Sequence, residues 1–180
     1  MLCVRTERDG LLSAIAPVGL AAAVETALVV DLDEEGPNYR GEGSLARLVA
    51  EGPTRRDLHP SRSGVAVLRN GGITYQDAEE VLDALAEGWP HMVLRLPHRG
   101  PLLRYAPVVP VIPLLPGALA VGLSTPAVFQ GAGFRLAPPA PGPVLPRPSR
   151  RTVGGLLRGE IDSRSRWIRA WRSVWDLPWT

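Results

Sequence analysis

The chain has 180 residues, 45% of them apolar, and this length and composition suit one domain with a sizeable core rather than two. It contains no lysine, so all 20 basic residues are arginine, and the formal net charge is +2. Because Cys3 is the single cysteine, an internal disulfide and a cysteine metal cluster are excluded, and a reducing cytoplasm is the expected location.

Charge is distributed unevenly along the chain. Residues 1–100 carry 10 arginines against 15 acidic residues, whereas residues 101–180 carry 10 against 3. An anionic partner is therefore expected at the C-terminal part. The N-terminus lacks the pattern of a signal peptide, and five prolines in the uncharged stretch Tyr105–Phe134 disfavour a transmembrane helix there. A buried strand followed by a short helix is expected instead.

Strands and helices alternate over the first 115 residues. After an apolar start at Leu2–Arg5, helices are predicted over Leu11–Val24, Leu45–Glu51 and the segment after Thr74. Continuous apolar runs, typical of strands buried on both faces, predict strands over Ala27–Leu32, Val65–Leu68, Met92–Leu96 and Val108–Leu115. This order predicts a three-layer, doubly wound α/β fold with a mainly parallel sheet.

The C-terminal part is organised differently. The proline-rich segment 137–148 is expected to connect an α/β core at 1–136 to a basic, Trp-rich helical segment at 149–180, packed on the core. Helices are predicted there over Ser149–Arg158 and Ser163–Trp175, and the second is amphipathic.

Several segments are similar, in order, to parts of the MinD/ParA ATPases. Ala27–Gly36 (ALVVDLDEEG) resembles their V-D-x-D-P-Q-G strand end, and Ser44–Gly52 is similar to the short helix that follows it. Gly64–Gly72 resembles the next strand with its glycine loop, and Asp83–Pro97 the helix and strand that end at an acidic D-x-P-P element. Leu145–Gly159 is similar to a late strand and its helix. The resemblance implies a P-loop NTPase-like fold.

The phosphate loop that the resemblance implies is degenerate. The family's K-G-G-x-G-K-[ST]-[ST] loop corresponds to Thr6–Ser13 (TERDGLLS), which keeps Gly10 and Ser13 but has no lysine. Arg8 is a poor substitute, because a guanidinium lacks the compact charge of an ammonium. We therefore expect no phosphate cradle, no nucleotide hydrolysis and no cofactor.

The acidic positions of the implied site are only partly kept. Asp31 and Asp33 stand at the family's metal-binding and water-orienting positions, and Arg95 stands where the family has a metal-linked aspartate. Without phosphate and magnesium, the two carboxylates are expected to be solvated groups at a strand end. No other catalytic motif is present, and the three histidines lack metal-ligand spacing.

The C-terminal helix carries a stripe of tryptophans. Trp167, Trp171 and Trp175 recur every four residues and so share one helix face. The stripe has three alternative interpretations. The tryptophans pack on the protein's own core, they dock a partner protein, or they lie on an anionic membrane. Nucleic-acid binding is not expected. The arginines interleaved with them are Arg164, Arg166, Arg169 and Arg172.

Together these features predict a non-catalytic MinD/ParA-like interaction or scaffolding protein, linked to pilus or secretion, division or partition machinery. The alternative is an ATPase with an unconventional phosphate loop. A protein partner is expected in the cytoplasm or at the inner face of the membrane, and homo-oligomerisation is left open. The vestigial nucleotide-site positions are Arg8, Gly10, Ser13, Asp31 and Asp33. The expected partner-docking residues are Trp167, Trp171, Trp175, Arg164, Arg169 and Arg172.

Overall fold

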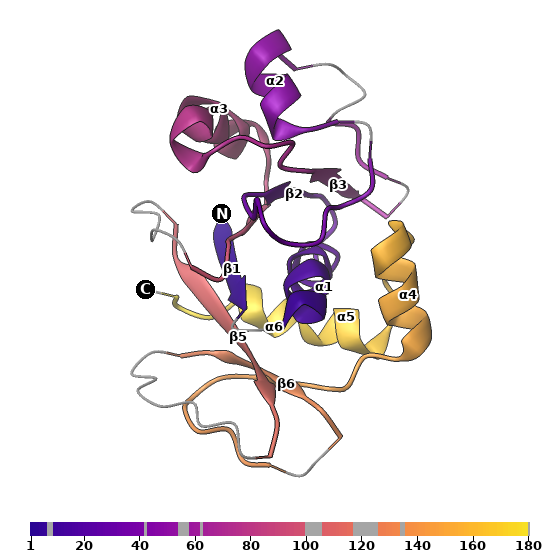
Figure 1. Cartoon of the computed structure of the whole chain (residues 1–180). Coiled ribbons are helices and arrows are strands. Elements are labelled where there is room, and N and C mark those ends of the chain that lie inside the picture. Colours follow the sequence, from indigo (N-terminus) through magenta and orange to yellow (C-terminus); the bar gives the residue numbers. More distant parts are fainter. Residues whose placement is uncertain are drawn as a thin grey trace.

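The computed structural model of the chain describes residues 1–6, 9–41, 43–53, 58–61, 63–99, 106–116, 126–133 and 136–179. Within these residues, seven strands form one sheet in the order β3-β2-β4-β1-β5-β6-β7, and every neighbouring pair is parallel (Figure 1). The strands are β1 (Leu2–Thr6), β2 (Ala27–Asp31), β3 (Val65–Leu68), β4 (Met92–Arg95), β5 (Val108–Leu114), β6 (Val128–Gly131) and β7 (Val144–Leu145).

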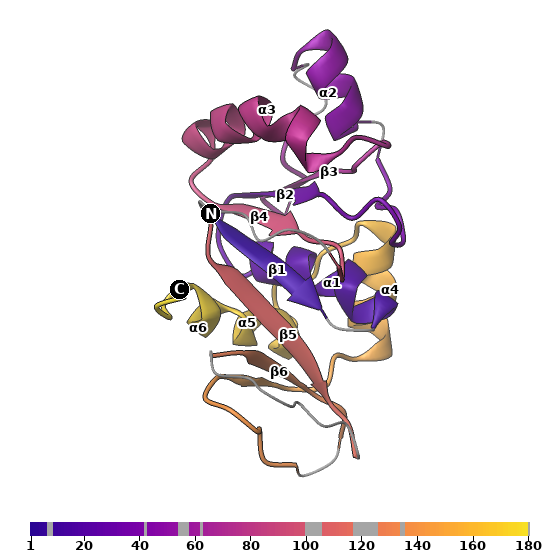
Figure 2. The same cartoon turned by 60° about the vertical axis from the view of Figure 1, so that its left-hand side comes forward.

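Helices cover both faces of this sheet. The helices are α1 (Gly10–Ala21), α2 (Leu45–Glu51), α3 (Tyr75–Gly88), α4 (Arg150–Arg158), α5 (Arg166–Ala170) and α6 (Arg172–Trp175). One hydrophobic core lies between the sheet and α1, α4, α5 and α6, and a second lies between the sheet and α2 and α3 (Figures 1 and 2). Successive residues of a strand enter opposite cores, so that Val29 faces α1 whereas Leu28 faces the other side. The three-layer, parallel α/β arrangement is therefore as predicted.

The three strands predicted to be neighbours lie side by side. β2 pairs with β3 on one edge and with β4 on the other, both in parallel register. Local signals also located α2 and α3 correctly. Ser44 caps α2 by accepting a hydrogen bond from Arg47 N at 3.2 Å, and Thr74 caps α3 in the same way.

Two expectations for the C-terminal part need correction. The connector predicted at 137–148 contributes β7, which pairs with β6, so the sheet extends beyond the predicted core boundary. The continuous helix predicted over Ser163–Trp175 is divided at Trp171 into α5 and α6. Trp171 N bonds to Ile168 O, and Val174 N bonds to Trp171 O, each at 3.0 Å. These i to i−3 bonds are of the 3₁₀ type, and they interrupt the regular α-helix at Trp171.

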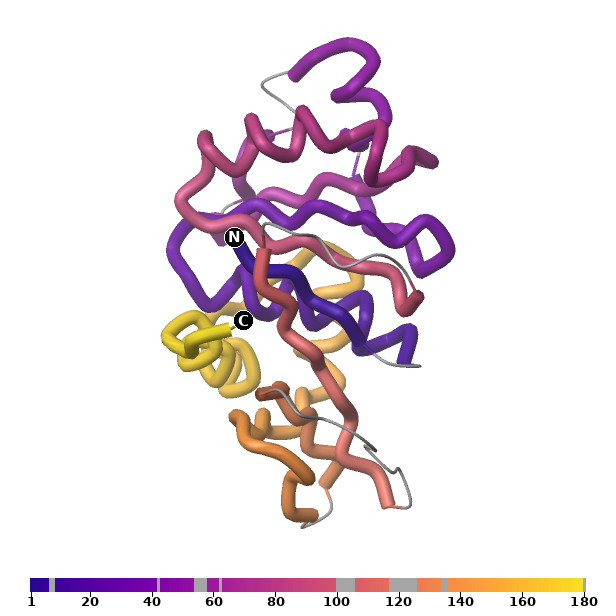
Figure 3. Tube along the Cα trace, turned by 90° about the vertical axis from the view of Figure 1, so that its left-hand side faces the viewer, coloured from indigo at the N-terminus to yellow at the C-terminus, as the bar shows by residue number. Residues whose placement is uncertain are grey.

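The two chain ends lie close together in all three views (Figures 1, 2 and 3). Among the described residues, no helix has the length and apolar character needed to cross a membrane. The short helix expected after β5 would fall on residues 117–125, which lie outside the described ranges.

Candidate functional site

Three of the five positions predicted for a vestigial nucleotide site, Ser13, Asp31 and Asp33, meet Arg95 at the carboxyl ends of β2 and β4. Asp31 ends β2, Arg95 ends β4, and the two are Cα partners in the parallel register. Val29 and Val93, two residues earlier in each strand, belong to the core beneath α1. Because strand side chains alternate with a period of two, Asp31 and Arg95 also point toward α1.

The Arg95 guanidinium is held on several sides by oxygen atoms. Nη1 donates to Asp31 Oδ2 at 3.1 Å and to the Pro37 carbonyl at 2.7 Å. Nη2 donates to Asp33 Oδ2 at 2.7 Å, and Nε donates to Ser13 Oγ in α1 at 3.1 Å. The Arg95 side chain is only 1% exposed. We call this set of side chains, Ser13, Asp31, Asp33 and Arg95, the Arg95 cluster.

Backbone amides satisfy the remaining carboxylate oxygens of the Arg95 cluster. Asp31 Oδ1 accepts from Asp33 N, and Asp33 Oδ1 accepts from Gly36 N, both at 3.0 Å. A Cβ atom at Gly36 would overlap both Arg95 Nη2 and Asp33 Oδ2. The loop after β2 can therefore close over the ion pair only because residue 36 has no side chain.

Two negative charges share one positive charge in this buried position. Burial raises the pKa of Asp31 to about 6, although the nearby Arg95 opposes the shift. The Tyr39 ring lies 5.3 Å from Arg95 Cζ and covers the guanidinium, and burial also raises the pKa of its hydroxyl.

These contacts correct the expectation that Asp31 and Asp33 are solvated. The two residues are 0% and 7% exposed, because Arg95 supplies the opposite charge that makes their burial tolerable. The sequence contained a signal for this pairing, since Arg95 is a lone charged residue inside the apolar run Met92–Leu96. The sequence does not contain the strand register between β2 and β4, which places Arg95 opposite Asp31.

At the start of α1, an acidic side chain binds a backbone amide of the first turn. Asp9 is the N-cap, and its Oδ1 accepts from Leu12 N at 2.9 Å. A carboxylate thus occupies one amide of the first turn, and its negative charge lies where an anionic ligand of a helix N-terminus would bind. Gly10 is the first residue of α1, and Arg8 lies outside the described residues.

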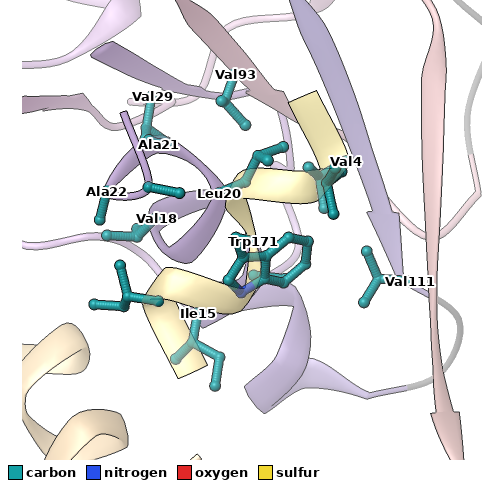
Figure 4. Packing of buried hydrophobic residues seen from close by; sticks show 14 of the residues in the cluster. Val4, Ile15, Val18, Leu20, Ala21, Ala22, Val29, Val93, Val111 and Trp171 are labelled. Carbon is teal, nitrogen blue, oxygen red and sulfur yellow. The ribbon is translucent and has the colours of Figure 1, made fainter. Parts of the chain in front are cut away.

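The tryptophan stripe packs inside the protein. Trp167 and Trp171 are 1% and 0% exposed, and their rings meet edge to face at 5.5 Å. Figure 4 shows Trp171 among core residues such as Ile15 and Val111. Trp175 is partly buried and donates to Leu20 O at 3.0 Å. The expected exposed docking strip is therefore absent among these tryptophans, because they fill the space between α1 and the sheet.

The arginines of the same segment lie on the surface. Arg164, Arg169 and Arg172 are exposed and make no ion pair with a described residue. They remain available to a partner, whereas Trp167 and Trp171 do not.

Comparison with known proteins adds no family assignment. No model of a known protein family matches the chain, and no curated protein matches it. In the described part of the chain, no three or more His, Cys, Asp or Glu side chains are grouped to hold a metal ion.

Proposed function

We propose that this protein is a non-catalytic MinD/ParA-like interaction or scaffolding protein in which an internal ion cluster replaces the nucleotide site. The observation that carries the proposal is the position of Arg95. Its guanidinium is bound by Ser13, Asp31 and Asp33. By resemblance, these are the positions of the magnesium-binding hydroxyl, the metal-binding carboxylate and the water-orienting carboxylate.

A fixed cation at this position has two consequences for chemistry. An arginine stays protonated at all physiological pH values, so the oxygens around it remain engaged. A magnesium ion at the same oxygens would lie beside the guanidinium, and the repulsion between like charges would oppose its binding. The cluster therefore holds α1 and the ends of β2 and β4 together, as a bound metal ion would, but it supplies no metal-ion chemistry.

The proposal also concerns how such a protein would act. In the resembling family, dimers are clamped by shared ATP, and that reason to dimerise is absent if no nucleotide binds. A permanently closed site suits a protein with one constant shape that presents a surface to a partner. The exposed arginines Arg164, Arg169 and Arg172 are our candidates for that surface.

Calorimetric titration with magnesium and ATP tests the non-catalytic half of the proposal. We expect no binding at the Arg95 cluster. Micromolar affinity that is lost in Arg8→Ala but kept in Arg40→Ala, which removes the same charge from an exposed loop, would establish the alternative of an ATPase with an unconventional phosphate loop.

Crosslinking in the native host tests the interaction half. The wild-type chain is expected to crosslink reproducibly to a protein partner, and the variant with Arg164, Arg169 and Arg172 all changed to alanine is expected to lose that product while staying folded. A wild-type chain with no crosslinked partner would contradict a scaffolding role. If the triple variant still forms the crosslinked product, the docking surface lies elsewhere on the protein.

A further inference from the structure

A depression of about 520 Å³ lies where α4 meets α5, and it shares no lining residue with the Arg95 cluster. Four arginines line it, and one of them, Arg158 at the end of α4, is paired with Glu160. The other three come from three separate segments. Arg147 follows β7, Arg151 lies in the first turn of α4, and Arg166 begins α5. We call this depression the arginine pocket.

Ion pairs among the described residues leave most of the positive charge of the arginine pocket unbalanced. None of Arg147, Arg151 and Arg166 makes an ion pair with a residue in the described ranges. Of the two acidic residues in the lining, Glu160 is already paired with Arg158, at 2.8 Å. Asp162 alone cannot balance three guanidinium groups.

Three hydroxyl groups line the arginine pocket beside the charged side chains. Ser149 Oγ and Thr152 Oγ1 are 2.9 Å apart, and Thr152 Oγ1 and Ser165 Oγ are 3.1 Å apart. Each hydroxyl can donate or accept, so this row can turn a proton toward an oxygen atom of a ligand.

The placement of charge on α4 is unfavourable unless an anion is present. Arg150 and Arg151 occupy its first turn, where the partial positive charge of the helix N-terminus repels cations, and that turn contains no acidic residue. The guanidinium groups around the pocket also repel one another. A bound anion would relieve both repulsions together.

We propose that the arginine pocket binds a phosphate-type oxyanion carried by a small soluble molecule, with Arg151 and Arg166 as its main ligands. A planar guanidinium group binds two phosphate oxygens at once. Several guanidinium groups together suit a multivalent anion such as phosphate better than they suit a singly charged carboxylate. The depression is concave, and its volume lies within the range of small-molecule sites. Both features favour a phosphorylated small molecule over a flat anionic surface.

Pyrophosphate is the probe for the first experiment, in calorimetric titrations at low salt with acetate as the comparison anion. We expect pyrophosphate to bind and acetate to bind at least about tenfold more weakly. The Arg151→Ala/Arg166→Ala variant should lose at least about tenfold in pyrophosphate affinity. The matched control is Arg150→Ala/Arg164→Ala, which removes the same charge from α4 and from the residues just before α5 but leaves the pocket lining unchanged. It should change the affinity by less than about threefold.

Several results would overturn the proposal. These are no pyrophosphate binding by the wild-type chain, equal binding of acetate, and equal losses in the pocket and control variants, since equal losses would indicate only a general positive field. Wild-type binding to phosphatidylglycerol vesicles without binding of pyrophosphate would assign the arginines to a membrane surface instead. ATP binding that is lost in the Arg151→Ala/Arg166→Ala variant but kept in Arg8→Ala would support the pocket and leave the non-catalytic proposal intact.

Discussion

Replacing Arg95 by methionine tests the physical role of the Arg95 cluster. The substitution keeps much of the side-chain volume but leaves Asp31 and Asp33, 0% and 7% exposed, without their cation. Removing one partner of a buried ion pair costs about 3–5 kcal/mol, because the remaining charge stays out of water. That cost is a large part of the roughly 5–15 kcal/mol that stabilises an ordinary domain. We therefore expect Arg95→Met to be folded only marginally at pH 8.

Urea unfolding followed by circular dichroism measures this loss. At pH 5 the loss should be smaller, because the pKa of Asp31 is already about 6 and rises further when Arg95 is removed. The variant with Asp31→Asn and Asp33→Asn added to Arg95→Met should recover much of the stability, since no charge is then buried. As a control, Arg158→Met removes an exposed arginine and should have no measurable effect.

The reasoning about Arg95 would be refuted by either of two results. One is a loss below about 1 kcal/mol for Arg95→Met at pH 8, which is the size of an ordinary hydrogen bond. The other is a triple variant no more stable than Arg95→Met, which would mean that the unpaired carboxylates are not the cause of the loss.

Three further predictions concern packing and pH. A Cβ at Gly19 would lie 2.6 Å from Trp167 Cη2 and 2.8 Å from Trp171 Nε1, so Gly19→Ala should cost about 1–3 kcal/mol, whereas Gly10→Ala, with open space around it, should cost little. Trp171→Ala should cost about 3–5 kcal/mol in the same urea assay, and a smaller loss than for Gly19→Ala would contradict its place in the core. The folded-state pKa of Asp31 is raised from 3.8 to about 6, so its contribution to stability is present below pH 4 and is lost as pH rises through 6. Wild-type stability relative to Asp31→Asn should therefore fall by up to about 3 kcal/mol over this range, and a relative rise would contradict the pKa shift.

The amino-acid sequence by itself determined the local elements and their order. Apolar runs of strand length marked β2, β3 and β4 within one residue at each end. Ser44 and Thr74 marked the starts of α2 and α3, because each side chain accepts a hydrogen bond from an amide three residues later. These signals are contained within a few residues of sequence, so they could be recognised without the fold.

Only the tertiary structure decided which residues meet. Asp31 and Arg95 are 64 residues apart in sequence, and they become partners because β4 lies beside β2 in one particular register. A shift of one residue would turn either side chain to the opposite face of the sheet. The division of the last helix at Trp171 likewise depends on the space between α1 and the sheet, where Gly19 lets the indoles approach. Helical periodicity describes a face of a helix but not the shape of the surface that receives it, and that shape is made by residues distant in the chain.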